Sequence, residues 1–170
     1  NAIMAMGRVL NALSTELPPR FAARTHRLLP SPTLNAGLIE GGVKPNVIAE
    51  DCRVVVDRRM LPGEQADAVL QELREVAERA VQGSGATIEI RATMVKPGSE
   101  VPGEAEVVAE CQKAFQAVTG RPAEIRGSTG YTDAHWFNLD FRIPAVMFGP
   151  WYLHRPAGSV SDIPDEFNYV

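Results

Sequence analysis

Two neighbouring arginines, Arg58 and Arg59, end a valine-rich run, and Asn46 lies near its start. A guanidinium can hold a planar carboxylate through two parallel hydrogen bonds, provided that a rigid element fixes its direction. Glycines and prolines bound the run on both sides, so residues 47–60 are predicted to form one strand. Alternate side chains of a strand point to opposite faces, so the two arginines are expected on opposite faces. From composition alone, the alternative interpretation of this run is a solvated edge strand with no binding role.

A glycine-rich loop and the histidines are further candidates for chemistry. Residues 127–133 read Gly-Ser-Thr-Gly-Tyr-Thr-Asp, and such a loop can present backbone N–H groups to an anion. Its spacing matches no phosphate-binding signature. His26 and His135 are expected to have structural roles.

The spacing of apolar residues predicts the elements that position these groups. A helix is expected over residues 1–17, ending before two prolines, and a strand over 33–40 forms a hairpin with 47–60. A second helix over 64–81 and a returning strand over 87–95 follow. Together they form a ferredoxin-like α+β pattern that lacks its first strand.

The composition changes at the run Lys-Pro-Gly-Ser that begins at Lys96, which predicts a domain boundary. The two domains are expected over residues 1–96 and 97–170. The elements expected in the second are a helix over 104–118, a short strand over 123–126, a helical turn to Phe137 and a buried parallel strand over 143–148.

Length and charge exclude several classes of partner. The chain has 170 residues, a formal charge of −4 and a pI near 5.4, so nucleic acid and anionic membranes are not expected partners. No apolar run reaches the length of a membrane span. Cys52 and Cys111 lack Cys-x-x-Cys spacing and are expected to be free thiols. Arginines at 8, 20, 24 and 27 are interpreted as solvated surface.

The run from Gly41 to Glu64 also resembles a known segment. Its Gly-Gly, Pro-Asn-Val-Ile and Val-Val-Asp-Arg-Arg-Met-Leu-Pro-Gly-Glu are similar to the lid of a zinc-dependent amidohydrolase and metallopeptidase family. That family includes acetylornithine deacetylase, succinyl-diaminopimelate desuccinylase, aminoacylase and glutamate carboxypeptidase. Residues 131–134, 143–150 and 164–167 continue the resemblance in the same order.

The resemblance implies a site for a substrate carboxylate. Arg59 matches the lid arginine that clamps this group, and Asn46 matches the lid asparagine that reaches across a dimer toward the partner's metal site. Gly130 and Thr132 match the loop that lines the same pocket. Such a clamp would orient an N-acyl amino acid so that its amide carbonyl lies over the metals.

The resemblance also implies two zinc ions, most of whose ligands lie in an N-terminal half with His-x-Asp and Glu-Glu motifs. This chain contains neither motif, so no catalytic residue is expected in it and it is expected to be inactive alone. The family's remaining ligand is a histidine, and Asp162 stands at its position. His154 is the alternative ligand, and an ordinary hydrogen bond is the alternative role for His154.

The sequence thus predicts an α/β fragment of a hydrolase that deacylates N-acyl amino acids or cleaves dipeptide-like amides. It contains a lid and the C-terminal segment of a catalytic domain. A homodimer is expected through the lid's first helix and the strand over 33–40. The expected location is the cytoplasm. The rival interpretation is a non-catalytic module for carboxylate binding or dimerisation.

Overall fold

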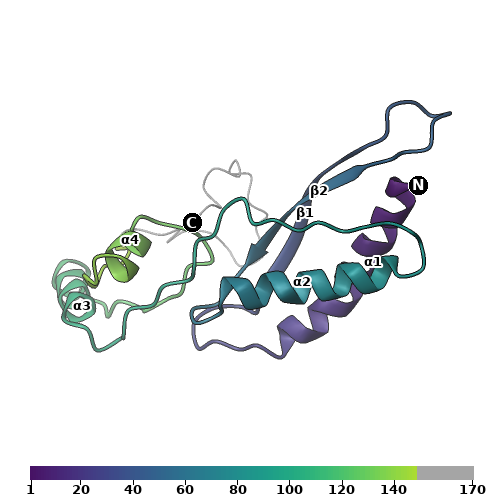
Figure 1. The fold of residues 1–170 in the computed structure, drawn as a ribbon. Helices are drawn as coiled ribbons and strands as arrows, with labels where there is room; N and C mark the ends of the chain where they lie inside the picture. The colour runs from purple at the N-terminus through teal and green to yellow at the C-terminus, as the bar shows by residue number, and fades with distance from the viewer. Residues whose placement is uncertain (149–170) are drawn as a thin grey trace. The chain divides into compact units, whose positions relative to one another are not determined.

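The computed structural model describes residues 1–148, which contain four helices and two strands (Figure 1). The chain divides into two compact units, Asn1–Gly98 and Ser99–Val170. Helices together with an antiparallel pair of strands confirm the predicted mixed α/β class. Within the part of the chain that the structure describes, none of the helices combines the length and the apolar character that crossing a bilayer requires.

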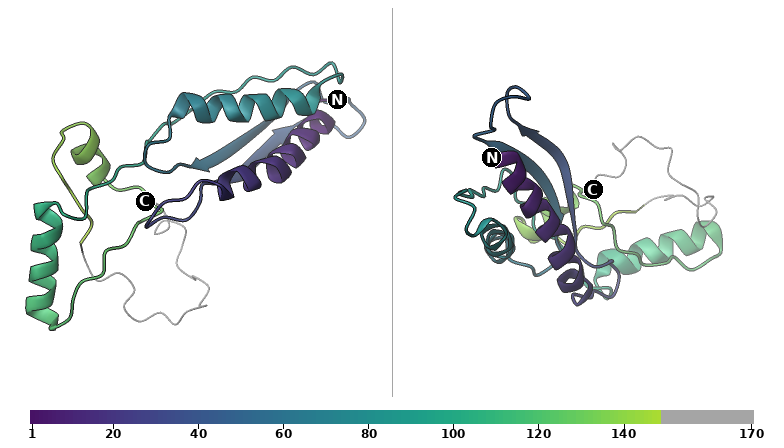
Figure 2. Two further views of the ribbon diagram at one scale, coloured as in Figure 1. Left: turned by 90° about the horizontal axis from the view of Figure 1, so that it is seen from below. Right: turned by 90° about the vertical axis from the view of Figure 1, so that its right-hand side faces the viewer.

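The first unit packs two helices side by side on one face of a hairpin (Figures 1 and 2). The helices are α1, Ala2–Ala22, and α2, Ala66–Val81. The strands are β1, Thr33–Gly41, and β2, Cys52–Arg59. Apolar side chains one helical turn apart on α1 and α2 form its core. These are Ala5, Val9, Ala12, Leu13, Leu17, Phe21, Val69, Leu73, Val76, Ala77 and Val81.

Helix α1 continues through Pro18 and Pro19, so the predicted end before these residues is wrong. Proline cannot donate the helical hydrogen bond to the carbonyl four residues earlier. The carbonyl groups of Ser14 and Thr15 therefore have no helical donor from Pro18 and Pro19. All four residues are exposed, so these carbonyl groups can accept hydrogen bonds from water. Leu17 and Phe21 lie one turn apart in the core. Tertiary packing therefore holds the last turns of the helix together.

The hairpin is shorter than predicted at its far end. Strand β2 begins at Cys52, opposite Gly41, instead of near residue 47. Residues 42–51 form a long connection that contains no regular strand. The pairing of β1 with β2 is antiparallel and has one irregularity, a bulge between Ala36 and Leu38.

The strand predicted over residues 87–95 does not form. Ile88 and Ile90 nevertheless pack against the core, half-buried, so the alternating pattern has the expected apolar role. A strand exists only where a neighbour completes its hydrogen-bond ladder, and the sheet of the described chain contains β1 and β2 alone.

The second unit contains α3, Glu106–Thr119, and α4, Ala134–Leu139. Gly120 ends α3 in the left-handed conformation at φ 71°, as its sequence predicts. The strands predicted over 123–126 and 143–148 are wrong. A buried parallel strand requires neighbours on both edges, whereas Ile143 and Phe148 are largely exposed here.

Candidate functional site

Arg59 lies at the end of β2 on the face of the sheet that the helices leave uncovered. Its side chain is 37% exposed, and its Nε lies 3.0 Å from Oδ1 of Asp57. Asp57 is two residues earlier on the strand and therefore on the same face. This contact orients the guanidinium through Nε. A guanidinium has five N–H donors in a planar fork, a geometry that matches a carboxylate.

Arg58 has the opposite environment, as the alternation of the strand predicts. Its side chain is only 5% exposed, and its guanidinium lies over the ring of Phe21 at 4.3 Å from the centroid. Nη2 donates to Oε1 of Glu64 at 2.8 Å, and Nη1 contacts the carbonyl oxygen of Arg59. Arg58 therefore fixes the backbone that carries Arg59.

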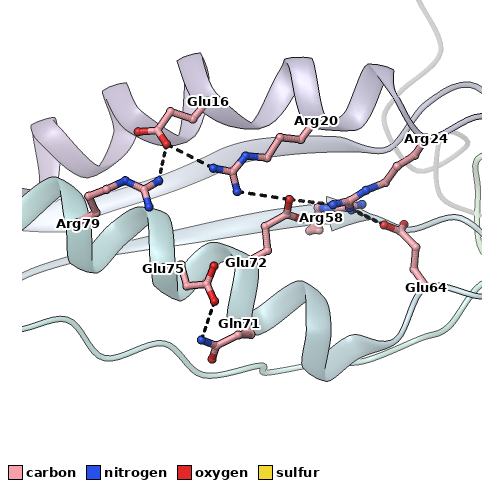
Figure 3. Close-up of polar contacts among 9 residues, drawn as sticks. All are labelled: Glu16, Arg20, Arg24, Arg58, Glu64, Gln71, Glu72, Glu75 and Arg79. Carbon is pink, nitrogen blue, oxygen red and sulfur yellow. Dashed lines mark hydrogen bonds and ion pairs between the residues drawn. The ribbon is translucent and has the colours of Figure 1, made fainter.

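Arg58 belongs to a set of alternating charges between α1, α2 and the end of β2 (Figure 3). We call Glu16, Arg20, Arg24, Arg58, Glu64, Glu72 and Arg79 the charge ladder. Arg24 occupies its centre and donates to both Glu64 and Glu72 at 2.8 Å. The interpretation of Arg24 as solvated surface is therefore wrong, because its contacts come from residues 40 and 48 positions away.

Glu64 joins the ladder to the turn after β2. Its Oε2 accepts the backbone N–H of Leu61 at 2.6 Å, and Oε1 accepts from Arg58 and Arg24. Burial acts to raise the pKa of Glu64, but the hydrogen bonds from Leu61, Arg58 and Arg24 and the charge of Arg58 outweigh it, and the pKa is lowered. Glu64 is thus held as a carboxylate.

Asn46 lies in the connection between the strands, at the other end of the hairpin from Arg59, and is exposed. The base of this connection is attached to α1, because the N–H of Ala2 donates to the carbonyl oxygen of Ala49 at 2.8 Å. Ala49 is buried. The start of α1 therefore anchors the loop that carries Asn46.

Gly130 and Thr132 belong to the second unit, in the loop before α4. The N–H of Gly130 donates to Oγ of Ser128 at 3.1 Å, and the carbonyl oxygen of Thr132 accepts from the N–H of His135 at 3.1 Å. His135 is buried, with its ring 5.1 Å from that of Tyr131, which fits the structural role expected for it.

His154 and Asp162, the two alternative metal ligands, lie outside the described residues. Among residues 1–148, no three His, Cys, Asp or Glu side chains are grouped so as to hold a metal ion. Cys52 and Cys111 are free, as predicted, and half-buried. The described side chains therefore do not by themselves form a metal centre.

The charge ladder is the part of the site region that sequence reasoning did not identify. Glu16, Arg20 and Arg24 are spaced four residues apart, and Glu72 and Arg79 on α2 are spaced seven apart. Both spacings place charges on one side of a helix, which is also typical of exposed helix surface. A signal was present in Phe21, an apolar residue among arginines, because an aromatic ring can hold a buried guanidinium.

Comparison with known proteins identifies the first unit. The family M20_dimer, described as Peptidase dimerisation domain, matches residues 1–83. This range contains both Asn46 and Arg59, and it includes all of the hairpin and both helices of the first unit.

Three relatives show the extent of the similarity. Acetylornithine deacetylase of Myxococcus xanthus is 36% identical over 80 residues, 46% of this chain and 21% of the relative. N-formyl-4-amino-5-aminomethyl-2-methylpyrimidine deformylase of Bacillus subtilis is 31% identical over 145 residues, which are 76% of this chain and 33% of the relative. Acetylornithine deacetylase of Aliivibrio salmonicida is 28% identical over 171 residues, with 98% of this chain and 42% of the relative covered. The chain thus spans less than half the length of these relatives.

Proposed function

Because the chain belongs to the M20 peptidase family and carries its dimerisation domain, we propose that it forms part of a metal-dependent hydrolase. The reaction is removal of the acyl group from N-acyl amino acids or cleavage of dipeptide-like amides. Residues 1–96 are the lid and 97–170 the C-terminal segment of the catalytic domain. The relatives that are named deacetylase or deformylase support hydrolysis of a small amide.

The observation that carries this proposal is the position of Arg59. Its guanidinium lies on the face of the sheet opposite α1 and α2, with Nε oriented by Asp57 and the backbone held by the buried Arg58. A carboxylate that binds in two parallel hydrogen bonds would be fixed in both position and angle. Positioning of this kind accelerates a reaction by bringing the scissile bond to the reactive groups.

Three further residues have proposed roles in the same enzyme. Asn46 reaches toward the active site of the partner subunit in a homodimer, and Gly130 and Thr132 line the substrate pocket. Exposure of Asn46 at the far end of the hairpin supports its role. We place the enzyme in the cytoplasm.

Zinc is the proposed metal of the whole enzyme, where it would supply an acidic bound water as the source of hydroxide. The described residues do not fit a metal site on their own, so no step is assigned to the metal here. His154 and Asp162 remain the alternative ligands that this chain would contribute.

The test compares this chain with a full-length enzyme that contains it. With added zinc or cobalt, the 170-residue chain should hydrolyse no N-acetyl amino acid, whereas the full-length enzyme should do so and should lose the activity to a chelator. Metal-restored turnover by the short chain would contradict the assignment of roles. A full-length protein that binds these compounds without hydrolysing them would instead indicate the non-catalytic module.

A further inference from the structure

A single side chain joins three segments of the second unit. Asn138 lies on α4 and is half-buried. Its Nδ2 donates to the carbonyl oxygen of Ala145 at 3.0 Å, and its Oδ1 accepts from the N–H of Ala145 at 2.8 Å. Nδ2 also donates to Oγ of Ser99, the first residue of the unit, at 3.4 Å. The amide thus connects α4 to the run 143–148 and to the start of the unit.

The two bonds to Ala145 fix the orientation of α4 as well as its place. One residue of a strand pairs with another in the same way, by donating to its carbonyl and accepting from its N–H. A side-chain amide can do this because it carries both a donor and an acceptor. A neighbouring bond runs from the N–H of Ile143 to the carbonyl oxygen of Phe137 at 2.8 Å. The end of α4 is therefore attached to the run 143–148 at two consecutive helix residues.

Helix α4 depends on this attachment because it is short. It has 6 residues, whereas an isolated helix needs about 12 or more to be stable in water. Within the described part of the chain, Asp133 at its N-cap makes no capping hydrogen bond through its side chain. The direction of the helix therefore depends on the contacts near its end, where Asn138 lies.

The other end of α4 carries the loop that contains Gly130 and Thr132. The N–H of His135 donates to the carbonyl oxygen of Thr132 at 3.1 Å, and the N–H of Trp136 donates to that of Asp133 at 3.0 Å. These bonds join the end of the loop to the first turn of the helix. A change in the direction of α4 would therefore displace Thr132.

We propose, on the basis of the proposed function, that Asn138 is a positioning residue for the substrate pocket. It does not touch the substrate itself. It holds α4 in the direction that lets Gly130 and Thr132 line the pocket. Contacts that a substrate makes equally in its ground state and transition state affect KM and not kcat. Loss of the hydrogen bonds of Asn138 should therefore weaken substrate binding and leave the chemical step unchanged.

Asn138→Asp is the variant that tests this role. It keeps the size of the side chain and the acceptor for the N–H of Ala145, but it replaces the amide donor with a carboxylate oxygen that faces the carbonyl oxygen of Ala145. In the full-length enzyme, KM for an N-acetyl amino acid should rise about tenfold, the size of one lost hydrogen bond that leaves its acceptor unpaired. The value of kcat should stay within about twofold.

Hydrogen exchange in the 170-residue chain measures the same effect without hydrolysis. At neutral pH the amides of His135 and Ala145 should exchange about tenfold faster in Asn138→Asp. The amides of α3 should keep their rates, which a general loss of stability in the unit would change. At low pH the protonated carboxyl can donate to the carbonyl of Ala145. The ratio of the variant's exchange rates to those of the wild type should then fall toward one.

Gln112→Glu is the matched control. Gln112 on α3 is also a half-buried amide, and its Nε2 donates to the carbonyl oxygen of Ala123 at 3.4 Å. The substitution makes the same change of an amide to a carboxylate, so it should leave KM and the exchange of His135 unchanged. If Asn138→Asp fails to fold, Ser99→Ala takes its place. It removes one acceptor of Asn138 and should raise KM about twofold.

The proposal is wrong if kcat falls while KM stays the same, or if Gln112→Glu has the same effects as Asn138→Asp. It is also wrong if exchange becomes faster at Ala145 but not at His135, because Asn138 would then hold only the run 143–148. If exchange responds as expected while the full-length enzyme hydrolyses no N-acyl amino acid or dipeptide-like amide, only the proposed function fails.

Discussion

At the scale of single residues, the charge and planarity of Arg59 carry the proposed function. In the full-length enzyme, Arg59→Lys should lower kcat/KM about ten- to a hundredfold, since an ammonium cannot reproduce the planar fork and a charged hydrogen bond contributes about 1.5 to 3 kcal/mol. The loss should be much smaller with a substrate whose carboxylate is amidated. Steady-state kinetics with both substrates measures the difference.

Arg53 is the matched control for this substitution. It lies on the same strand and face as Arg59 but is exposed and opposite Glu40, so Arg53→Lys should leave kcat/KM within about twofold. Arg58→Lys, which the sequence alone suggests as a silent change, is unsuitable because Arg58 is buried in the charge ladder. An equal penalty for Arg59→Lys with the amidated substrate would show that Arg59 supports the lid itself.

At the scale of elements, the charge ladder makes the packing of α1 and α2 on β2 depend on pH. The folded state lowers the pKa of Glu64 below its ordinary value of 4.5. Its contribution to stability is therefore present above that value and is lost as the pH falls through the lower, folded pKa. Glu64→Gln should reduce the free energy of unfolding near neutral pH. It should also make this free energy decrease less steeply as the pH is lowered. Urea unfolding across this range tests both effects.

Glu89 provides the comparison for Glu64. The pKa of Glu89 is also lowered, by its hydrogen bond and charge interaction with Arg91, but the pair is exposed. Solvent and salt screen such a pair, so Glu89→Gln should leave the pH dependence of unfolding almost unchanged. The same less steep decrease in both variants would contradict a special role for the ladder.

The attachment of α1 to the hairpin connection is the second prediction at this scale. Ala2 is the first residue of the helix, a position where proline is well tolerated. Ala2→Pro therefore removes the N–H that bonds to Ala49 without breaking the helix. Hydrogen exchange over residues 42–51 should become faster, while the helical circular dichroism stays the same.

Ala66→Pro places proline at the same position of α2. The residue before it, Gln65, has the extended conformation that proline prefers to follow, at φ −92° and ψ 130°. Exchange over residues 42–51 should not change in this variant. If Ala2→Pro also leaves that exchange unchanged, the start of α1 does not anchor the loop.

At the scale of the whole molecule, we predict that two copies pair through α1 and β1. Among the described residues the sheet contains only β1 and β2, so both are edge strands, which favour pairing with another chain. The matched family is a dimerisation domain. Met4 on α1 is 68% exposed. Met4→Glu should weaken the dimer at least tenfold, because a charge buried without a partner in an interface is unfavourable. Sedimentation equilibrium over a concentration series measures this.

Met94 is the control, since it is 72% exposed but lies outside α1 and β1. Met94→Glu should leave the association unchanged. A wild-type chain that remains monomeric at high concentration, or equal weakening by both substitutions, would count against this interface.

The sequence by itself determined the features that depend on neighbouring residues. Helices α2 and α3 were predictable because their apolar side chains recur at helical spacing, and because Gly120 adopts the left-handed conformation that ends α3. The opposite faces of Arg58 and Arg59 followed from the alternation of a strand. The resemblance that identified the family rests on such local runs of residues.

Only the tertiary structure decided the features that depend on contacts between distant segments. Phe21 and Arg24, far from β2 in the sequence, bury Arg58 and complete the ladder around Glu64. Helix α1 continues through Pro18 and Pro19 because Leu17 and Phe21 are buried, although proline by itself favours ending a helix. The bulge that places Leu38 opposite Val55 depends on pairing with β2. Such outcomes follow from packing free energy, which the spacing of residues along the chain does not contain.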